Sequence, residues 1–466
     1  MIFSIDDQSF KNRIALIDGL TGEQWTYERL CHEVRLRQLA LQTSKKALVF
    51  HFCGNTPTAV AWYLAAIEAG QTIGLLPGNL DAALCDRLLE AFHPDFVLLP
   101  ESPGVNFIPA SLPGLWRRTR EEDYPEIRDG LGLLLSTSGS TGSPKLVRLS
   151  RDSVEANARS IQEALELTAE DRPIAHLPLS YSYGLSVVNS HLLIGASIVL
   201  TRDSLITPGF WRTVSEHRVT SFSGVPYTYQ MLQRLDLDHL PAQSVVTMTQ
   251  AGGKLDDKTI LWFHDKMAAR SGRFWVMYGQ TEAVARIAIL PASELPEMVG
   301  CAGKAIPRGS LSIHTDAGTT TQAGIAEELV YRGPNVMWGY AFTRPDLAKG
   351  DELQGVLATG DRARLDEKGY VYILGRSKRD AKLFGLRINM DDLESLLKAH
   401  GPTAVVNGPD RLIVYCEFGD DTELRHLKTE MCLQLKLHSS GLEFRRIDKL
   451  PTTSSGKIDY SQLEVQ

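Results

Sequence analysis

Short apolar runs recur along most of the chain, and glycine- or serine-rich loops follow them. The runs lie at Ala47–Phe52, Phe96–Leu99, Leu131–Leu135, Ile198–Leu200, Val219–Phe222 and Phe274–Met277. Between two of them, apolar residues from Val154 to Leu165 recur every three or four positions. This spacing places them on one face of a helix, which Asp152 and Glu155 are expected to cap. Strands that alternate with helices predict an α/β fold, whose large N-terminal domain has mostly parallel sheets flanked by helices.

The C-terminal part of the chain has a different pattern. Three apolar segments surround a stretch with helical spacing, and a further helix is expected before them. The segments are Ala404–Val406, Leu412–Cys416 and Leu442–Ile447, and the expected helices are Asp391–Ala399 and Leu424–Leu435. This mixture predicts a small α+β domain that moves. The junction Gly375–Asp380 is short and charged, which suits a hinge. We therefore expect an N-terminal domain at residues 1–375, a hinge at 376–378 and a C-terminal domain at 379–466.

Composition excludes several classes of protein. The chain has 466 residues, of which 43% are hydrophobic and 23% charged, and this usage argues against disorder, a collagen and a coiled coil. The net charge of −7 provides no global basic field, so we expect no nucleic-acid partner. The longest apolar stretch, Leu185–Leu200, is too short and too polar to span a bilayer.

The cysteines and the N-terminus bear on location. Six cysteines are scattered without a CxxC pair, which predicts neither a zinc site nor a redox motif. They are too sparse for a disulfide scaffold, which fits a reducing compartment. The N-terminus lacks the basic-then-apolar order of a signal peptide. These features predict a cytoplasmic protein without a membrane span.

The segment from Ser136 to Lys145 carries the clearest chemistry. Its glycines let the backbone approach a ligand closely, its hydroxyl and N–H groups suit an anion, and its lysine adds positive charge. The segment therefore predicts a phosphate cradle, although no hydroxyl follows the lysine as it does in a P-loop. The alternative is a flexible Ser/Gly loop. The candidate ligands are Thr137, Ser138, Gly139, Ser140, Thr141, Gly142 and Lys145.

This segment resembles the phosphate loop of the adenylate-forming superfamily, which includes acyl- and aryl-CoA synthetases, peptide-synthetase adenylation domains and luciferases. Further motifs of that superfamily occur in the expected order. They are Tyr278-Gly279-Gln280-Thr281-Glu282, Thr359-Gly360-Asp361, Gly375-Arg376, the stretch from Lys382 through Gly385 and Arg387 to Glu394, and Pro451–Ile458. The resemblance covers residues 20 to 462 and is closest to the AMP-forming acyl-CoA synthetase branch.

The resemblance implies that ATP and Mg²⁺ bind to the N-terminal domain. Glu282 follows a predicted parallel strand, at the end where such sheets bind ligands, and oxygen ligands suit Mg²⁺. The resemblance assigns Glu282 to the metal, with Thr137 as a further metal ligand, and assigns Thr281 to the α-phosphate. The other implied nucleotide contacts are Tyr278 on adenine, Ala251, Gly252 and Gly253 on its other side, Gly279 and Gln280, and Asp361 and Arg376 on the ribose.

The resemblance also implies a reaction in two steps. A carboxylate attacks the α-phosphorus of ATP, which gives an acyl-adenylate and pyrophosphate, and a thiol then displaces AMP. Lys457 matches the catalytic lysine that reaches across the domain interface and stabilises developing charge. For the second step the small domain rotates about Lys378, so that Lys382 and Gly385 face the active site. Without the resemblance, Lys457 and Lys378 are interpreted as solvated surface lysines.

The acid is predicted from the stretch His176–Ser186. It contains no Asp or Glu, so the ammonium group of an amino acid would be buried without a partner, which is costly. The resemblance places Tyr181 at the aromatic gate beside the substrate carboxylate. Gly224, Val225 and Pro226 form the pocket wall, and Tyr183 and Gly252 complete an apolar slot for a fatty or aromatic acid. Glu327 departs from the glycine usual in the superfamily, and we assign it no function.

The thiol and the overall class leave alternatives open. The acceptor is either coenzyme A or the phosphopantetheine arm of an acyl carrier protein, because both present the same reactive group. One alternative is a stand-alone adenylating enzyme that loads a carrier protein or an amine. Another is a nucleotide-binding relative without catalysis, but the presence of Lys457, Glu282 and Asp361 argues against it.

Overall fold

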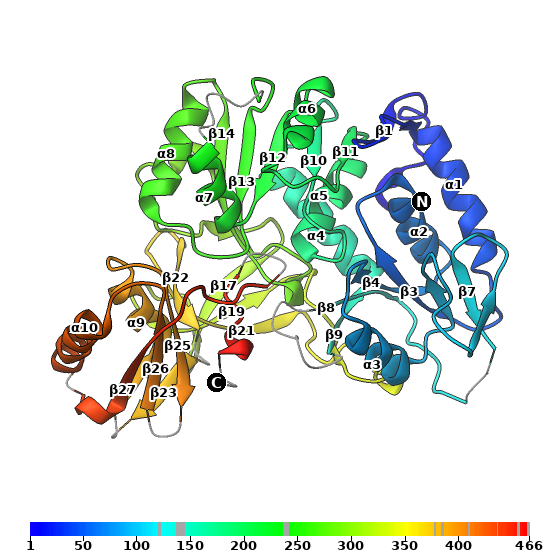
Figure 1. Ribbon diagram of the computed structural model, residues 1–466. Helices are drawn as coiled ribbons and strands as arrows, with labels where there is room; N and C mark the ends of the chain where they lie inside the picture. Colours follow the sequence, from blue (N-terminus) through cyan, green and yellow to red (C-terminus); the bar gives the residue numbers. More distant parts are fainter. Residues whose placement is uncertain are drawn as a thin grey trace. The chain divides into compact units, whose positions relative to one another are not determined.

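The protein forms two compact units, which are shown in Figure 1. The computed structural model describes residues 1–119, 123–136, 145–235, 242–376, 379–383, 386–408, 411–435, 437–453 and 457–463. The first unit comprises Met1–Ser310 and Tyr331–Leu357, and the second comprises Leu311–Val330 and Ala358–Gln466. The second unit thus begins before the expected hinge, because a sheet formed by strands within residues 310–332 and 356–376 belongs largely to it. The hinge itself stays a prediction, and Lys378 lies outside the described residues.

One sheet of the first unit has the strand order β16-β15-β14-β13-β12-β10-β11-β1-β2. Its central strands are parallel from β14 to β1, and β2, β15 and β16 run antiparallel at its edges. Parallel neighbours need crossover connections, which helices supply here, so both faces are covered and central strands such as β12 and β13 are buried along their length. The strands are β1 (Ile14–Asp18), β2 (Gln24–Thr26), β10 (Pro173–Ala175), β11 (Ile198–Leu200), β12 (Ser221–Gly224), β13 (Thr247–Gln250), β14 (Arg273–Tyr278), β15 (Ala288–Leu290) and β16 (Lys304–Ala305). The helices are α4 (Arg151–Ala164), α5 (Ser182–Leu192), α6 (Pro208–Glu216), α7 (Pro226–Leu235) and α8 (Asp257–Ala268).

A second sheet of this unit has the order β20-β9-β8-β4-β3-β5-β7-β6. Its centre is parallel, and its outer strands are antiparallel. The strands are β3 (Leu48–Cys53), β4 (Thr72–Pro77), β5 (Phe96–Leu98), β6 (Phe107–Pro109), β7 (Leu115–Arg118), β8 (Leu131–Ser136), β9 (Leu146–Ser150) and β20 (Gly339–Ala341). Helices α1 (Tyr27–Ala40), α2 (Pro57–Glu68) and α3 (Ala82–Phe92) belong to the same N-terminal region.

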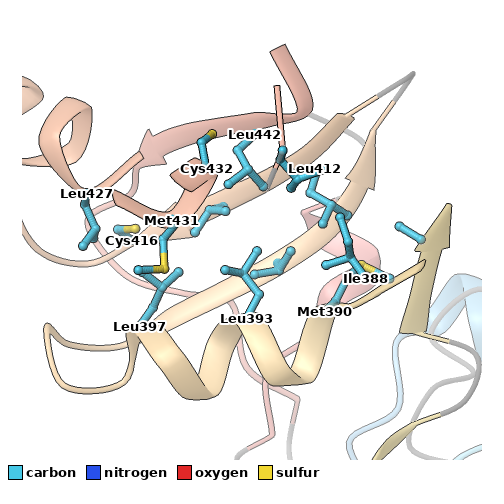
Figure 2. Packing of buried hydrophobic residues seen from close by; sticks show 14 of the residues in the cluster. Ile388, Met390, Leu393, Leu397, Leu412, Cys416, Leu427, Met431, Cys432 and Leu442 are labelled. Atoms are coloured by element: carbon cyan, nitrogen blue, oxygen red, sulfur yellow. The ribbon is translucent and has the colours of Figure 1, made fainter. Parts of the chain in front are cut away.

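The second unit contains the sheet β18-β17-β19-β21-β22, the hairpin β23-β24 and the sheet β25-β26-β27. Figure 2 shows α9 and α10 directing apolar side chains, among them Leu393, Leu397 and Met431, onto one face of β25-β26-β27. Alternate residues of the same strands, such as Val406 and Tyr415, pack on the other face. The elements are β17 (Ser310–Thr315), β18 (Gly318–Thr320), β19 (Ala326–Arg332), β21 (Val356–Leu365), β22 (Val371–Arg376), β23 (Asp380–Leu383), β24 (Leu386–Asn389), α9 (Met390–Leu397), β25 (Thr403–Gly408), β26 (Arg411–Cys416), α10 (Asp421–Gln434) and β27 (Leu442–Arg446).

These elements confirm the predicted α/β class and the predicted small α+β region. Each apolar run named from the sequence forms or overlaps a strand, and the helical spacing of Val154–Leu165 belongs to α4. The predicted cap of α4 was wrong. Ser150 caps this helix, its hydroxyl accepting a hydrogen bond from Ser153 N at 2.9 Å, because the helix begins one residue before Asp152.

Candidate functional site

The carboxyl ends of four neighbouring parallel strands meet at one edge of the first sheet. These strands are β10, β12, β13 and β14, which lie side by side in the sheet order. The segments that follow them hold Tyr181 and Tyr183, Gly224 to Pro226, Ala251 to Gly253, and Tyr278 to Glu282. The structure therefore brings together most of the predicted adenine, metal and acid residues at the edge where parallel sheets bind ligands.

The turn after β14 is folded tightly back on the strand. Ile287 N donates to Tyr278 O at 2.9 Å. A β-carbon at Gly279 would lie only 1.8 Å from Ala285 O, so no other residue fits at this position without movement of the backbone. Val284 in the same turn has φ +61° and ψ −56°, an uncommon conformation for a β-branched residue. The turn thus fixes the short 3-10 helix Thr281–Ala283 beside the strand end.

Polar contacts then orient Thr281 and Glu282. Thr281 Oγ1 lies 3.2 Å from Ser182 Oγ at the start of α5. Glu282 Oε1 accepts a hydrogen bond from Tyr340 Oη at 2.9 Å. Lys145 Nζ lies 3.6 Å from the centroid of the Tyr340 ring. Tyr340 therefore connects the predicted metal ligand to the predicted phosphate lysine.

Tyr340 reaches this position through a long-range strand pairing. β20 runs antiparallel to β9, with Tyr340 opposite Val147, so it lies beside the strand that follows Lys145. Burial, followed by the Glu282 charge, raises the pKa of Tyr340 above its ordinary value, which keeps its hydroxyl a donor. The sequence prediction did not include Tyr340, because nothing in the spacing of the chain links it to Lys145.

The predicted acid residues also contact one another. Gly252 has φ +84°, and a β-carbon there would lie 2.6 Å from Tyr181 Oη and 3.1 Å from a Val225 methyl group. A β-carbon at Gly253 would lie 3.2 Å from the Pro226 ring. Burial raises the pKa of Tyr181 to about 12. The glycine turn after β13 therefore leaves room for Tyr181 and for the loop after β12.

Tyr183 is anchored more deeply than Tyr181. Its hydroxyl donates to Thr249 O at 2.8 Å and lies 2.8 Å from Thr249 Oγ1. Thr249 Oγ1 in turn lies 3.0 Å from Ser223 Oγ, and Tyr229 Oη donates to Thr249 O at 2.6 Å. This network fixes the ring of Tyr183 against the strand ends.

A second residue that the sequence prediction missed is Arg286. Its guanidinium carbon lies 4.1 Å from the centroid of the Tyr183 ring, and the residue is 2% exposed. The available signal was an arginine inside the otherwise apolar run Ala283–Leu290. This signal alone does not predict burial, because a single charged residue beside a strand is more often at the surface.

The predicted ribose residues lie together in the second unit. Asp361 and Arg376 are directly opposite each other in the antiparallel pair β21-β22. The backbone at Asp361 is fixed by a hydrogen bond from its N to Thr359 Oγ1 at 3.1 Å. Gly360 N donates to Glu328 Oε1 at 3.1 Å, which gives the residue after Glu327 a structural role.

Lys457 lies at the end of a narrow loop in the same unit. Thr453 N donates to Lys457 O at 2.7 Å, and Lys457 N donates to Thr453 Oγ1 at 3.3 Å. Thr452 and Ile458 form an antiparallel bridge. The backbone on both sides of Lys457 is therefore fixed, although residues 454–456 lie outside the described part of the chain.

A partly buried ionic cluster holds this loop against the start of the C-terminal region. Arg379 forms ion pairs with Asp391 at 2.6 Å and with Glu394 at 2.7 Å. Its guanidinium carbon lies 4.0 Å from the centroid of the Tyr460 ring, and Tyr460 Oη donates to Glu394 Oε2 at 3.0 Å.

Lys382 belongs to β23, opposite Arg387 of β24, whereas Gly385 is not among the described residues.

Comparison with known proteins places this arrangement in a family. Residues 4–341 match the family described as AMP-binding enzyme. The chain belongs to that family. A 2-succinylbenzoate–CoA ligase of Enterococcus faecalis is 25% identical over 94% of this chain and 92% of its own length. A putative acyl-CoA synthetase of Bacillus subtilis, YngI, is 29% identical over 70% of this chain, and the match spans 62% of that relative.

A solved structure agrees with the AMP-binding enzyme assignment at the level of fold. O-succinylbenzoate coenzyme A synthetase (MenE) from Bacillus subtilis, in complex with AMP, has a TM-score of 0.79 and 24% identity, covering 99% of this chain and 97% of that chain. The resemblance to adenylate-forming enzymes is thus confirmed. The family and its ligase relatives support adenylate-forming ligase activity on an acyl or aryl acid.

Part of the predicted site of this AMP-binding enzyme lies outside the residues that the structure describes. The phosphate-loop residues Thr137 to Gly142 are among the residues the structure does not describe.

The six cysteines are free thiols. Within the described residues, no three His, Cys, Asp or Glu side chains gather as a metal site. Across the same part of the chain, no helix has the length and apolarity to cross a membrane.

Proposed function

We propose that the protein activates a carboxylic acid with ATP and transfers the acyl group to a pantetheine thiol. The observation that carries this is that Tyr340 joins Glu282 to Lys145, while the neighbouring Thr281 is positioned by Ser182. A hydroxyl, a carboxylate and a cation at the carboxyl end of parallel strands suit a triphosphate and its metal. The acid residues Tyr181 and Gly252 lie at the same edge of the sheet.

In this proposal the nucleotide is held by residues of the predicted N-terminal domain and by Arg376 of the predicted hinge. The loop from Thr137 to Gly142 cradles the phosphates, and Lys145 adds positive charge. The adenine lies between Tyr278 and the Ala251–Gly253 turn. Asp361 and Arg376, which are cross-strand neighbours, bind the ribose.

Glu282 fits a magnesium site. Mg²⁺ keeps several waters and uses one or two protein carboxylates together with substrate phosphates, so a single glutamate is sufficient. Tyr340 donates to one oxygen of Glu282, which orients the carboxylate and leaves its other oxygen available for the metal. When bound, the ion would neutralise phosphate charge and assist the departure of pyrophosphate.

In the first step a carboxylate oxygen of the acid attacks the α-phosphorus. The bond between this phosphorus and the pyrophosphate oxygen breaks, and an acyl-adenylate forms. Thr281 binds the α-phosphate, and Lys457 stabilises the charge that develops there. Loss of one such donor typically costs about 3–4 kcal/mol, a hundred- to thousand-fold in rate.

In the second step a thiol sulfur attacks the acyl carbon and AMP leaves. The acceptor is coenzyme A or a phosphopantetheine-bearing carrier protein. The proposed rotation about Lys378 exposes Lys382 and Gly385 to the site for this step. The acid itself is proposed to be fatty or aromatic, since Val225 and Tyr181 lie against the Gly252 turn and the Tyr183 ring centroid lies 6.3 Å from that of Tyr181.

Acid-dependent exchange of labelled pyrophosphate into ATP tests the first step. We expect exchange with members of a broad acid panel, and Lys457→Ala should reduce it a hundredfold or more. Lys398→Ala, which changes an exposed lysine on the same unit, serves as the matched control. No exchange with any acid would contradict adenylation, and full exchange by Lys457→Ala would contradict the role of that lysine.

Mass spectrometry of the products identifies the acceptor. Coenzyme A and a phosphopantetheinylated carrier protein are offered side by side with the acid that supports exchange. A thioester with either one supports the two-step reaction. Accumulation of acyl-adenylate with both thiols present would contradict the second step.

A further inference from the structure

Arg286 is a buried cation that pairs with no carboxylate among the residues that the structure describes. It is 2% exposed, and it donates hydrogen bonds from Nε to Met277 Sδ at 3.2 Å and from Nη1 to Ala285 O at 3.3 Å. A thioether is a weak acceptor, and the second contact is long. Within the described part of the chain, no carboxylate oxygen lies within 4.0 Å of this guanidinium.

Arg148 shows what a satisfied buried arginine looks like in the same unit. It is fully buried, and its nitrogens donate to the carbonyls of Trp338, Tyr340, Lys349 and Gly350. It also forms an ion pair with Glu352. Among the described residues a carboxylate pairs with Arg148 and none pairs with Arg286, so Arg286 does not belong to a structural ion pair there.

The aromatic neighbours of Arg286 do not replace an anion. The guanidinium stacks on Tyr183, and such a contact attracts a cation, yet it is weaker than the desolvation of a buried charge. Burial raises the pKa of both Tyr183 and Tyr181, so neither phenol carries negative charge near neutral pH. Arginine stays protonated in proteins, which leaves a positive site that lacks its counter-charge.

The position of Arg286 connects it to the acid residues. Tyr183, on which it stacks, belongs to α5 next to Tyr181. Tyr181 lies against the Gly252 turn and, through it, Val225. Buried charges in proteins are normally paired, and a guanidinium fork matches the two oxygens of a carboxylate. The missing partner is therefore expected on the molecule that enters between these residues.

We propose that Arg286 binds a second anionic group of the acid substrate. The substrate is then an acid with a carboxylate that is activated and a further oxyanion, a carboxylate or a sulfonate, that pairs with Arg286. This inference rests on the proposed acid activation and narrows it. It replaces the expectation of a wholly apolar slot with a pocket that is apolar at its walls and cationic at one point.

The test compares acids of equal length with and without the second charge. Wild-type protein, Arg286→Met and Arg286→Lys are assayed by pyrophosphate exchange with matched pairs such as hexanoate and adipate, or phenylacetate and a carboxy-phenylacetate. A sulfonate of the same length separates the two anions. Arg273→Met is the matched control, because Arg273 lies at the opposite end of β14 and pairs with Glu166 at the surface.

We expect wild-type protein to favour the charged member of a pair. Arg286→Met should lose about thirty- to thousand-fold in kcat/KM for that member and lose the preference, because the second anion would be buried alone. Arg286→Lys should keep part of the preference. Equal use of both members by the wild type, or an unchanged preference in Arg286→Met, would overturn the proposal while leaving adenylation intact.

Binding is measured independently of turnover. Calorimetry with each acid, in the presence of a non-hydrolysable ATP analogue, should show tighter binding of the charged member to wild type and Arg273→Met than to Arg286→Met. This difference in affinity supports the role of Arg286 even if no pyrophosphate exchange occurs. A difference in affinity without exchange would contradict only the proposed adenylation. Equal affinities for all three proteins would overturn the inference.

Discussion

Tyr340 offers the sharpest test of how the site is oriented. Tyr340→Phe removes the hydrogen bond to Glu282 and keeps the ring beneath Lys145. A hydrogen bond to a charged group contributes about 1.5–3 kcal/mol. Because Glu282 is only partly buried, the lower end of this range applies, which corresponds to about a tenfold loss of rate.

The assay is pyrophosphate exchange at saturating ATP and a series of Mg²⁺ concentrations. Tyr340→Leu should lose more than Tyr340→Phe, because the contact with Lys145 disappears as well and contributes about 0.5–1 kcal/mol. In a Glu282→Gln background the same change should have little further effect, because the two side chains act as one unit. If Tyr340→Phe exchanges pyrophosphate at the wild-type rate while Glu282→Gln is inactive, the orienting role of Tyr340 is refuted.

The loss of a different buried tyrosine hydroxyl serves as a control that distinguishes an effect on the orientation of the site from an effect on stability. Tyr27 Oη donates to Ala196 O at 2.8 Å, far in sequence from the motifs of the site. Tyr27→Phe should lower the melting temperature by a few degrees, as loss of about 1 kcal/mol does, and leave exchange per folded molecule unchanged. Reduced exchange in this control would assign the Tyr340 effect to stability instead.

Three further changes follow from contacts in the two units. Gly252→Ala places a methyl group 2.6 Å from Tyr181 Oη at a positive φ, so the KM for the acid should rise about tenfold or more with the KM for ATP less affected; equal changes in both would contradict a role at the acid. Burial lowers the pKa of His176 to about 4, below its ordinary value, so the folded protein binds this proton later than the unfolded chain as the pH falls. Stability from this group is therefore present above about pH 6.5 and is lost towards pH 4, and His176→Phe should flatten the dependence of chemical denaturation on pH by up to about 3 kcal/mol. Glu394→Gln leaves the partly buried Arg379 with weaker pairing, so the second unit should lose up to about 3 kcal/mol of stability by hydrogen exchange, whereas Glu430→Gln on the exposed face of α10 should change little.

The sequence predicted the strands better than the contacts between them. Apolar runs such as Leu131–Leu135 form strands because both faces of a parallel sheet are buried, a property that each run carries locally. The residues that follow β10, β12, β13 and β14 were found from motifs, and their meeting is a consequence of the sheet order. That order is set by long-range packing and leaves no trace in the spacing of one segment.

The missed residues illustrate the same limit. Tyr340 reaches Lys145 only through the pairing of β20 with β9, which joins distant parts of the chain. Arg286 is buried because the turn after Gly279 folds back on β14, and its charge alone predicts exposure. The cap of α4 is Ser150 and not Asp152 because a hydroxyl two positions earlier caps equally well, and propensity does not distinguish the two residues.

The cluster around Arg379 has a mechanical meaning. Arg379 is the residue directly after the proposed hinge, and Tyr460, which it stacks on, lies three positions after Lys457. Glu394 of α9 bonds to both and also accepts from Val405 N at 2.7 Å. This cluster thus connects Arg379 to helix α9, to the sheet at Val405 and to the segment that follows Lys457. In the proposed rotation, a change of a few backbone dihedral angles between residues 376 and 378 would therefore move Lys457 together with Arg379, α9 and the sheet.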